Sequence, residues 1–79
     1  LEGKRGKDYK TLLQEYVQRD GDKHIVYHLL SESGPDHAKT FHMEVEINGV
    51  TYEAGFGKSK KIAEQHAAQL TLEKLMADK

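Results

Sequence analysis

The feature that most constrains the fold is a strictly alternating stretch in the middle of the chain. Apolar side chains at Phe41, Met43, Val45 and Ile47 alternate with polar ones at His42, Glu44 and Glu46. A period of two predicts a strand with one buried face and one face in water. Asn48-Gly49 follows at once, and both residues tolerate the positive φ angles of a type I′ turn. Residues 50–57 are therefore predicted to return as a second strand, whose alternating set on one face is Tyr52, Ala54 and Phe56.

Two helical patterns flank this hairpin. The first covers residues 9–17, with Asp8 as N-cap, and its apolar side chains recur at helical spacing: Tyr9, Leu12, Leu13, Tyr16 and Val17. The second begins after Ser59 as N-cap and runs to about Met76. One stripe of this second helix carries Ala63, Ala67 and Thr71, and such small residues allow a helix to lie close to a sheet. We expect the choice of Thr71 in this stripe to affect packing only.

A third strand is expected over residues 24–33, where Ile25, Val26 and Tyr27 favour extended structure. The order is then helix, three strands, helix. The fold class predicted is α+β, in the order α-β-β-β-α, with a three-stranded antiparallel sheet and two helices packed on one of its faces.

The chain has 79 residues, which is enough for one small domain. We assign residues 8–77 to that domain and residues 1–7 to a linker or tail. The first residue is not Met, which suggests a piece of a longer protein. There is no cysteine and no apolar run of about 18 residues, so we expect a cytoplasmic protein and no membrane partner.

The stretch GFGKSKK at positions 55–61 ends like a nucleotide-binding P-loop. That loop needs a glycine five positions before the glycine of GKS, and this position is Tyr52, so the spacing excludes it. Lys58, Lys60 and Lys61 nevertheless gather where a helix is predicted to begin. Unpaired N–H groups at a helix N-terminus already favour anions, and stability alone would place acids there. The lysines therefore indicate a phosphate-binding site, although the overall net charge is −1.

Two other polar regions accompany the lysines. On the predicted first helix, Thr11, Gln14, Glu15 and Gln18 follow one face. An ordinary solvated face is the simpler interpretation of that spacing, but these side chains also suit sugar hydroxyls and base edges. Between the first two strands lies Gly34-Pro35-Asp36-His37. Any loop uses Gly and Pro, whereas His37 can both donate and accept a hydrogen bond in a narrow space.

Catalytic interpretations find little support. The five histidines, at positions 24, 28, 37, 42 and 66, are spread over predicted strands, a loop and a helix. Ser59 has no base near it in the sequence, and the acidic residues form no cluster suited to magnesium. We expect no catalytic residue, no metal site and no cofactor within this piece.

Three segments together resemble the double-stranded RNA-binding domain: DYKTLLQEYVQ, GPDHAKTF and GFGKSKKIAEQHAA. The resemblance extends from about Asp8 to Leu75 and is closest to the C-terminal domain of bacterial ribonuclease III. It implies double-stranded RNA as the partner and three contact regions. The residues implied are Thr11, Gln14 and Glu15 in one minor groove, Pro35 and His37 in the next, and Lys58, Ser59, Lys60 and Lys61 on phosphates between them.

The resemblance also implies properties of a parent protein. Such a parent cleaves duplex RNA in ribosomal and messenger RNA processing, and a separate nuclease domain supplies its Mg²⁺ site and its homodimer contacts. Two alternatives stay open: a stand-alone, non-enzymatic duplex-RNA-binding protein, and an adaptor that keeps the fold but binds proteins. Glu64 departs from the lysine common in eukaryotic relatives, which is expected to weaken phosphate affinity.

Overall fold

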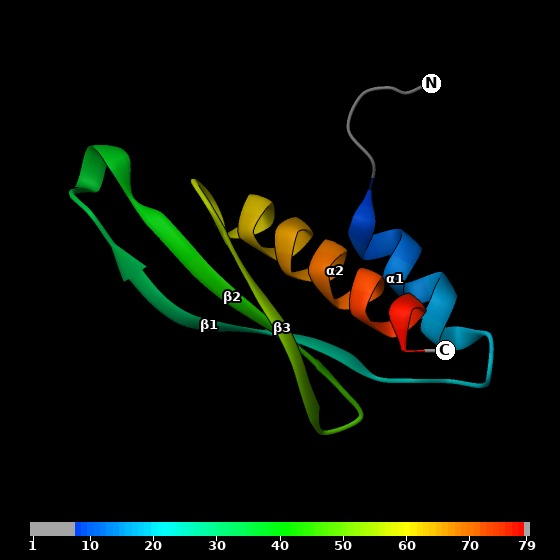
Figure 1. The fold of residues 1–79 in the computed structure, drawn as a ribbon. Coiled ribbons are helices and arrows are strands. Elements are labelled where there is room, and N and C mark those ends of the chain that lie inside the picture. Colours follow the sequence, from blue (N-terminus) through cyan, green and yellow to red (C-terminus); the bar gives the residue numbers. More distant parts are fainter. Residues whose placement is uncertain (1–7, 79) are drawn as a thin grey trace.

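The computed structural model describes residues 8–78; residues 1–7, predicted as a linker or tail, lie outside the described part. Two helices flank a three-stranded antiparallel sheet with the spatial order β1-β2-β3 (Figure 1). The elements are α1 (Tyr9–Gln18), β1 (Ile25–Ser33), the short 3₁₀ turn η1 (Asp36–Ala38), β2 (Thr40–Ile47), β3 (Val50–Gly57) and α2 (Lys60–Ala77). The predicted order α-β-β-β-α is confirmed.

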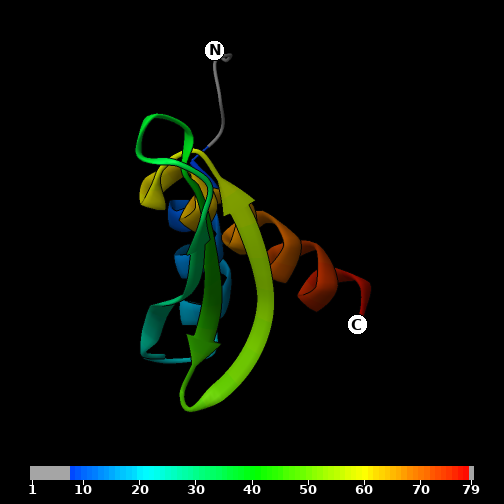
Figure 2. The same cartoon turned by 90° about the vertical axis from the view of Figure 1, so that its left-hand side faces the viewer.

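Both helices lie on the same face of the sheet, as predicted. Figure 1 shows α1 and α2 side by side against the strands, and Figure 2 shows the same two layers after a turn of 90°. Within residues 8–78, no element covers the opposite face of the sheet. This one-sided packing is why the central strand needs an apolar set and a polar set of side chains.

The core lies between β2 and the two helices. From β2 it takes Met43, Val45 and Ile47, which are at most 5% exposed and confirm three of the four predicted buried residues; Phe41, the fourth, is only partly buried. Leu13 and Val17 enter from α1, and the small stripe Ala63, Ala67 and Ala68 enters from α2. Asn48 and Gly49 close the β2–β3 hairpin with φ angles of 50° and 85°, as a type I′ turn requires.

Helix α2 lies unusually close to β3, because glycines on the strand face alanines on the helix. A Cβ atom at Gly55 would lie 2.4 Å from the backbone nitrogen of Ala67, and one at Gly57 would lie 2.4 Å from that of Ala63. These distances leave no room for any side chain on the strand. The predicted contact of small residues on α2 with the sheet therefore exists, and the residues that it meets on β3 are glycines.

The pairing of β3 with β2 contains a bulge. Glu44 pairs with Ala54, whereas Glu46 pairs with Thr51, so β3 has one residue more than β2 over this interval. An extra residue reverses the face on which the following side chains lie. Gly55 consequently meets α2.

The bulge makes the predicted alternation of β3 wrong. Tyr52 packs against the core, but Ala54 and Phe56 lie on the uncovered face, because they pair with Glu44 and His42. Phe56 is 55% exposed and stacks on the His42 ring, with 4.0 Å between ring centroids. The sequence pattern around a bulge is the same as that of a regular strand, so alternation alone assigned these residues to one face.

Thr71 also differs from expectation. It is fully buried, and its Oγ1 accepts a hydrogen bond from the backbone N–H of Glu53 at 3.2 Å. Glu53 lies in the bulged part of β3, where an amide loses its partner in the ladder. Thr71 therefore satisfies a backbone donor of the bulge, and the expectation of a packing role only is wrong.

Candidate nucleic-acid interface

The positive region is built on the first turn of α2. Ser59 is the N-cap, as predicted: its Oγ accepts from the backbone N–H of Ile62 at 3.1 Å. No acidic residue occupies the first turn, and Lys58, Lys60 and Lys61 are exposed. No carboxylate of residues 8–78 forms an ion pair with any of the three. The lysine side chains and the unpaired amides at the start of the helix are therefore exposed to solvent in the same region.

The loop between β1 and β2 lies beside this cluster. His37 and Lys58 line one hollow of about 420 Å³, together with Asp36, Ala38, Lys39 and Phe41. Pro35 precedes the 3₁₀ turn, and its carbonyl accepts from the Ala38 N–H at 2.9 Å. Pro35 and His37 are both exposed. The structure therefore brings the loop residues and the lysine cluster to one end of the molecule.

Sequence reasoning did not select Lys39, which lines the same hollow. Its ammonium lies 3.0 Å from a carboxylate oxygen of Glu32 and 3.9 Å from one of Asp36. Glu32 and Lys39 stand on opposite sides of the loop, so no local spacing marked the pair. Because two carboxylates surround Lys39, it adds less positive charge to the surface than Lys58 does.

On α1 the predicted contact residues all face solvent. Thr11, Gln14 and Glu15 are exposed, while Leu13 between them is buried. The Thr11 hydroxyl donates to Asp8 at 2.8 Å, so it keeps only its acceptor capacity for a ligand. The amide of Gln18 is used within the fold, since it binds the backbone N–H and C=O of Lys23.

The three regions follow one another across the molecule. In Figure 1 the β1–β2 loop, the start of α2 and helix α1 lie in that order from left to right. The described chain measures 42 × 34 × 20 Å, so the regions are spread over a flat body. No deep cleft is needed to present them to a large, extended ligand.

The N-terminal ends of α1 and α2 are tied by polar contacts. Lys10 of α1 forms an ion pair with Glu64 of α2 and lies over the Tyr27 ring, 4.8 Å from its centroid. Burial, followed by the charge of Glu64, raises the pKa of Tyr27 to about 12. Glu64 thus neutralises a lysine of α1 near the first turn of α2.

Asp8 gives this corner of the fold a pH dependence. The hydrogen bond from Gln65, and then those from Thr11, lower the pKa of the Asp8 carboxyl from 3.8 to about 2. Because the folded pKa is the lower one, the carboxylate stabilises the fold above about pH 4, and this contribution is lost as the pH falls through about 2. We expect the difference in unfolding free energy between wild type and Asp8→Asn to shrink over that interval. Urea titrations at several pH values measure it, and a constant difference would contradict the assignment.

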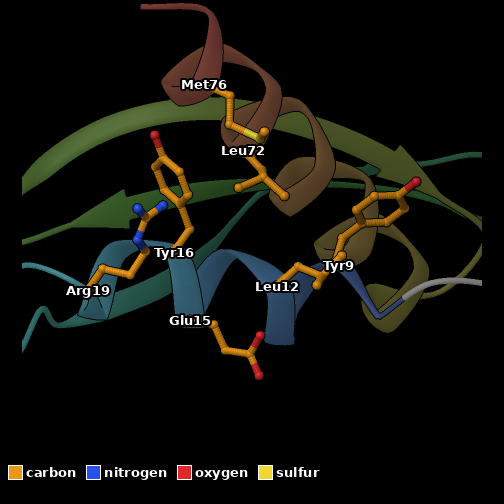
Figure 3. Close-up of a pocket in the computed structure, with 7 residues that line it drawn as sticks. All are labelled: Tyr9, Leu12, Glu15, Tyr16, Arg19, Leu72 and Met76. Carbon is orange, nitrogen blue, oxygen red and sulfur yellow. The ribbon is translucent and has the colours of Figure 1, made fainter. Parts of the chain in front are cut away.

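A groove between the helices has a different character. Figure 3 shows Leu72 and Met76 of α2 facing Tyr9, Leu12 and Tyr16 of α1, with Glu15 pointing away from them. The groove has a volume of about 490 Å³ and exposes 39% of Leu12 and 54% of Met76. Five of its seven lining residues are apolar or aromatic, and such a surface does not suit phosphate.

Two of the other histidines make side-chain hydrogen bonds within the fold. His28 contacts a carboxylate oxygen of Glu46 at 2.7 Å, and Nδ1 of His66 accepts from the backbone N–H of Phe56 at 3.0 Å. Among residues 8–78 no group of three or more His, Cys, Asp or Glu side chains could hold a metal ion. In the same part of the chain, no helix combines the length and apolar character needed to cross a bilayer.

Comparison with known proteins adds a family and relatives. The family model described as the double-stranded RNA binding motif matches residues 9–75. Ribonuclease 3 of Streptococcus pyogenes, from serotype M1 and from serotype M3 strain SSI-1, is 52% identical over 71 residues, which cover 90% of this chain and 31% of each relative. The chain thus spans about a third of the length of these relatives.

Solved structures agree with the fold. The solution structure of both dsRBDs of DRB4 with their linker matches with a TM-score of 0.63 at 37% identity, over 87% of this chain and 44% of that chain. The second dsRBD of DRB4 alone matches with a TM-score of 0.59 at 37% identity, over 86% of this chain and 94% of that chain.

Proposed function

The chain belongs to the double-stranded RNA binding motif family, and from this premise we propose that its three exposed polar regions bind one face of an RNA duplex. The observation that carries the proposal is the lysine cluster on the first turn of α2, which no carboxylate of residues 8–78 neutralises. In this assignment Lys58, Lys60 and Lys61 contact backbone phosphates across the major groove, and the Ser59 hydroxyl can donate to the same backbone.

The other two regions recognise the shape of the duplex. A-form RNA has a wide, shallow minor groove that displays 2′-hydroxyls, and domains of this family span about 16 base pairs by contacting two successive minor grooves. Thr11, Gln14 and Glu15 offer acceptors and an amide to one minor groove. Pro35 and His37, at the other end of the molecule, reach the next one. Glu15 suits a hydroxyl donor and would repel a phosphate, which supports the assignment of α1 to sugars.

For the whole protein we propose a ribonuclease III. The support is the 52% identity to Ribonuclease 3 and the fact that this chain spans only 31% of those relatives. In that assignment the present domain binds and positions duplex RNA during RNA processing in the cytoplasm. A separate nuclease domain would hold Mg²⁺, cleave the RNA and form the homodimer.

The test of RNA binding is a titration of the chain with a duplex RNA of about 20 base pairs. A matched DNA duplex and a single-stranded RNA serve as controls. Preference for duplex RNA supports the proposal. Equal or absent binding to all three would leave the fold intact and favour the protein-binding adaptor instead.

Gln14→Ala separates recognition of sugars from recognition of phosphates. Loss of a hydrogen bond to a 2′-hydroxyl should reduce the preference for RNA over DNA about three- to tenfold, because such a bond contributes about 1 kcal/mol. The salt dependence of binding should stay as in wild type, since no phosphate contact is removed. Gln69→Ala on α2 is the matched control. A lower salt slope with unchanged RNA preference would place Gln14 on a phosphate and refute the assignment.

A further inference from the structure

Gln65 of α2 caps the start of α1. Its Oε1 accepts hydrogen bonds from the backbone N–H groups of Tyr9 at 2.7 Å and Lys10 at 3.3 Å. The first amides of a helix have no partner within the helix and usually bind a residue just before it. Here a side chain 56 and 55 residues away in the sequence accepts from two of them. The cap therefore connects α2 to the start of α1.

The same side chain reaches the predicted RNA-binding surface of α1 through Asp8. Nε2 of Gln65 donates to Oδ1 of Asp8 at 2.9 Å. Asp8 in turn accepts from the Thr11 backbone N–H at 3.2 Å and from the Thr11 hydroxyl at 2.8 Å. A continuous set of hydrogen bonds thus runs from α2 to Thr11.

Gln65 also lies close to the lysine cluster along α2. Lys61 and Gln65 are four residues apart, which is about 6 Å along a helix. The phosphate-binding turn and the cap of α1 therefore belong to one short, rigid stretch of helix. Apart from the Lys10–Glu64 ion pair, the other contacts between the helices bury apolar groups, and such contacts do not depend on direction. Hydrogen bonds do, and Gln65 is bonded to the backbone of α1, whereas the ion pair joins two side chain ends; the Gln65 contacts therefore orient the start of α1 against α2.

We propose that Gln65 is a positioning residue for duplex RNA: it holds the minor-groove surface of α1 at a set distance from the phosphate-binding start of α2. The inference rests on the proposed function, because it assigns a role to the spacing between two of its regions. A duplex presents groove and phosphates at a given separation, so two surfaces held at that separation bind without a loss of conformational freedom. Gln65 itself need not touch the RNA.

The test is a double-mutant cycle between Gln65 and Gln14. Gln65→Ala should weaken duplex RNA binding about three- to tenfold, with the salt slope unchanged. In the Gln65→Ala background, Gln14→Ala should cost several-fold less than in wild type, because α1 is no longer held against the groove; contacts within one network couple to about this extent. Lys60→Ala should cost the same in both backgrounds, since the lysines stay on α2.

The comparison between Gln14 and Lys60 distinguishes positioning from stability. A variant that only lowered the folded fraction would change the cost of neither substitution, so additive effects for both would overturn the inference. If Gln65→Ala is not folded by circular dichroism, Asp8→Asn takes its place, because it weakens the next hydrogen bonds of the same set. Lack of duplex RNA binding by the wild-type chain would refute the proposed function, and this inference with it.

Discussion

Replacing Lys60 and Lys61 together by alanine should reduce the affinity for duplex RNA at least about thirtyfold and leave the fold intact. Each exposed lysine–phosphate contact contributes about 1 kcal/mol, and two are lost. Binding titrations at several salt concentrations measure the effect. The wild-type slope of log affinity against log salt should be roughly −3 for three phosphate contacts, and the variant should reduce its magnitude by about 2.

The stability of this variant gives an independent check. Cations at a helix N-terminus oppose the macrodipole, so removing them should leave the melting temperature unchanged or raise it. Lys74→Ala is the matched control, because Lys74 is an exposed lysine at the other end of α2. An unfolded double variant would mean that the two lysines stabilise the fold, and a Lys74→Ala variant that binds as weakly would mean that only total charge matters.

Gly55→Ala should destabilise the fold by about 3 kcal/mol or more. The new methyl group would lie 2.4 Å from the Ala67 backbone nitrogen and 2.7 Å from the His66 carbonyl carbon, so α2 must move away from the sheet. Overpacking of a core usually costs 1 to about 3 kcal/mol, and here backbone atoms rather than mobile side chains receive the clash. For a domain of this size the melting temperature should fall by roughly 15 °C.

A substitution on the opposite face of the same strand serves as the control. Ala54→Val adds volume one residue away but on the uncovered face, so its effect on the melting temperature should be within a few degrees. Thermal unfolding followed by circular dichroism measures both variants. Equal stability of Gly55→Ala and wild type would show that α2 does not approach β3 this closely.

Local patterns predicted most of the fold because they depend on the geometry of neighbouring residues. The period of two over residues 41–47 and the turn at Asn48-Gly49 require one hairpin, whatever else the chain does. The apolar spacing of residues 9–17 likewise predicts one buried helical face. The helix starts were predicted as well, because capping is local. The side chains of Asp8 and Ser59 each accept a hydrogen bond from the backbone N–H three residues later in the sequence.

The candidate site was predicted in its chemistry and only partly in its geometry. Ser59 marks the start of a helix, so Lys60 and Lys61 could be placed on its first turn from the sequence. Nothing in the sequence places His37 beside Lys58, because that proximity depends on the length and twist of the β1–β2 hairpin. The carboxylates around Lys39 also come together only when that hairpin forms.

The sequence by itself determined the order of the elements, the reversal at Asn48-Gly49 and the chemical character of each exposed region. Only the tertiary structure decided that a bulge turns Phe56 outward, that Thr71 satisfies the Glu53 amide, and that Gln65 caps α1. The Thr71 contact joins residues 18 positions apart and the Gln65 contact joins residues 56 positions apart. The position of Phe56 depends on one extra residue in β3. Such pairings arise from how the elements pack, and they leave no periodic pattern along the chain.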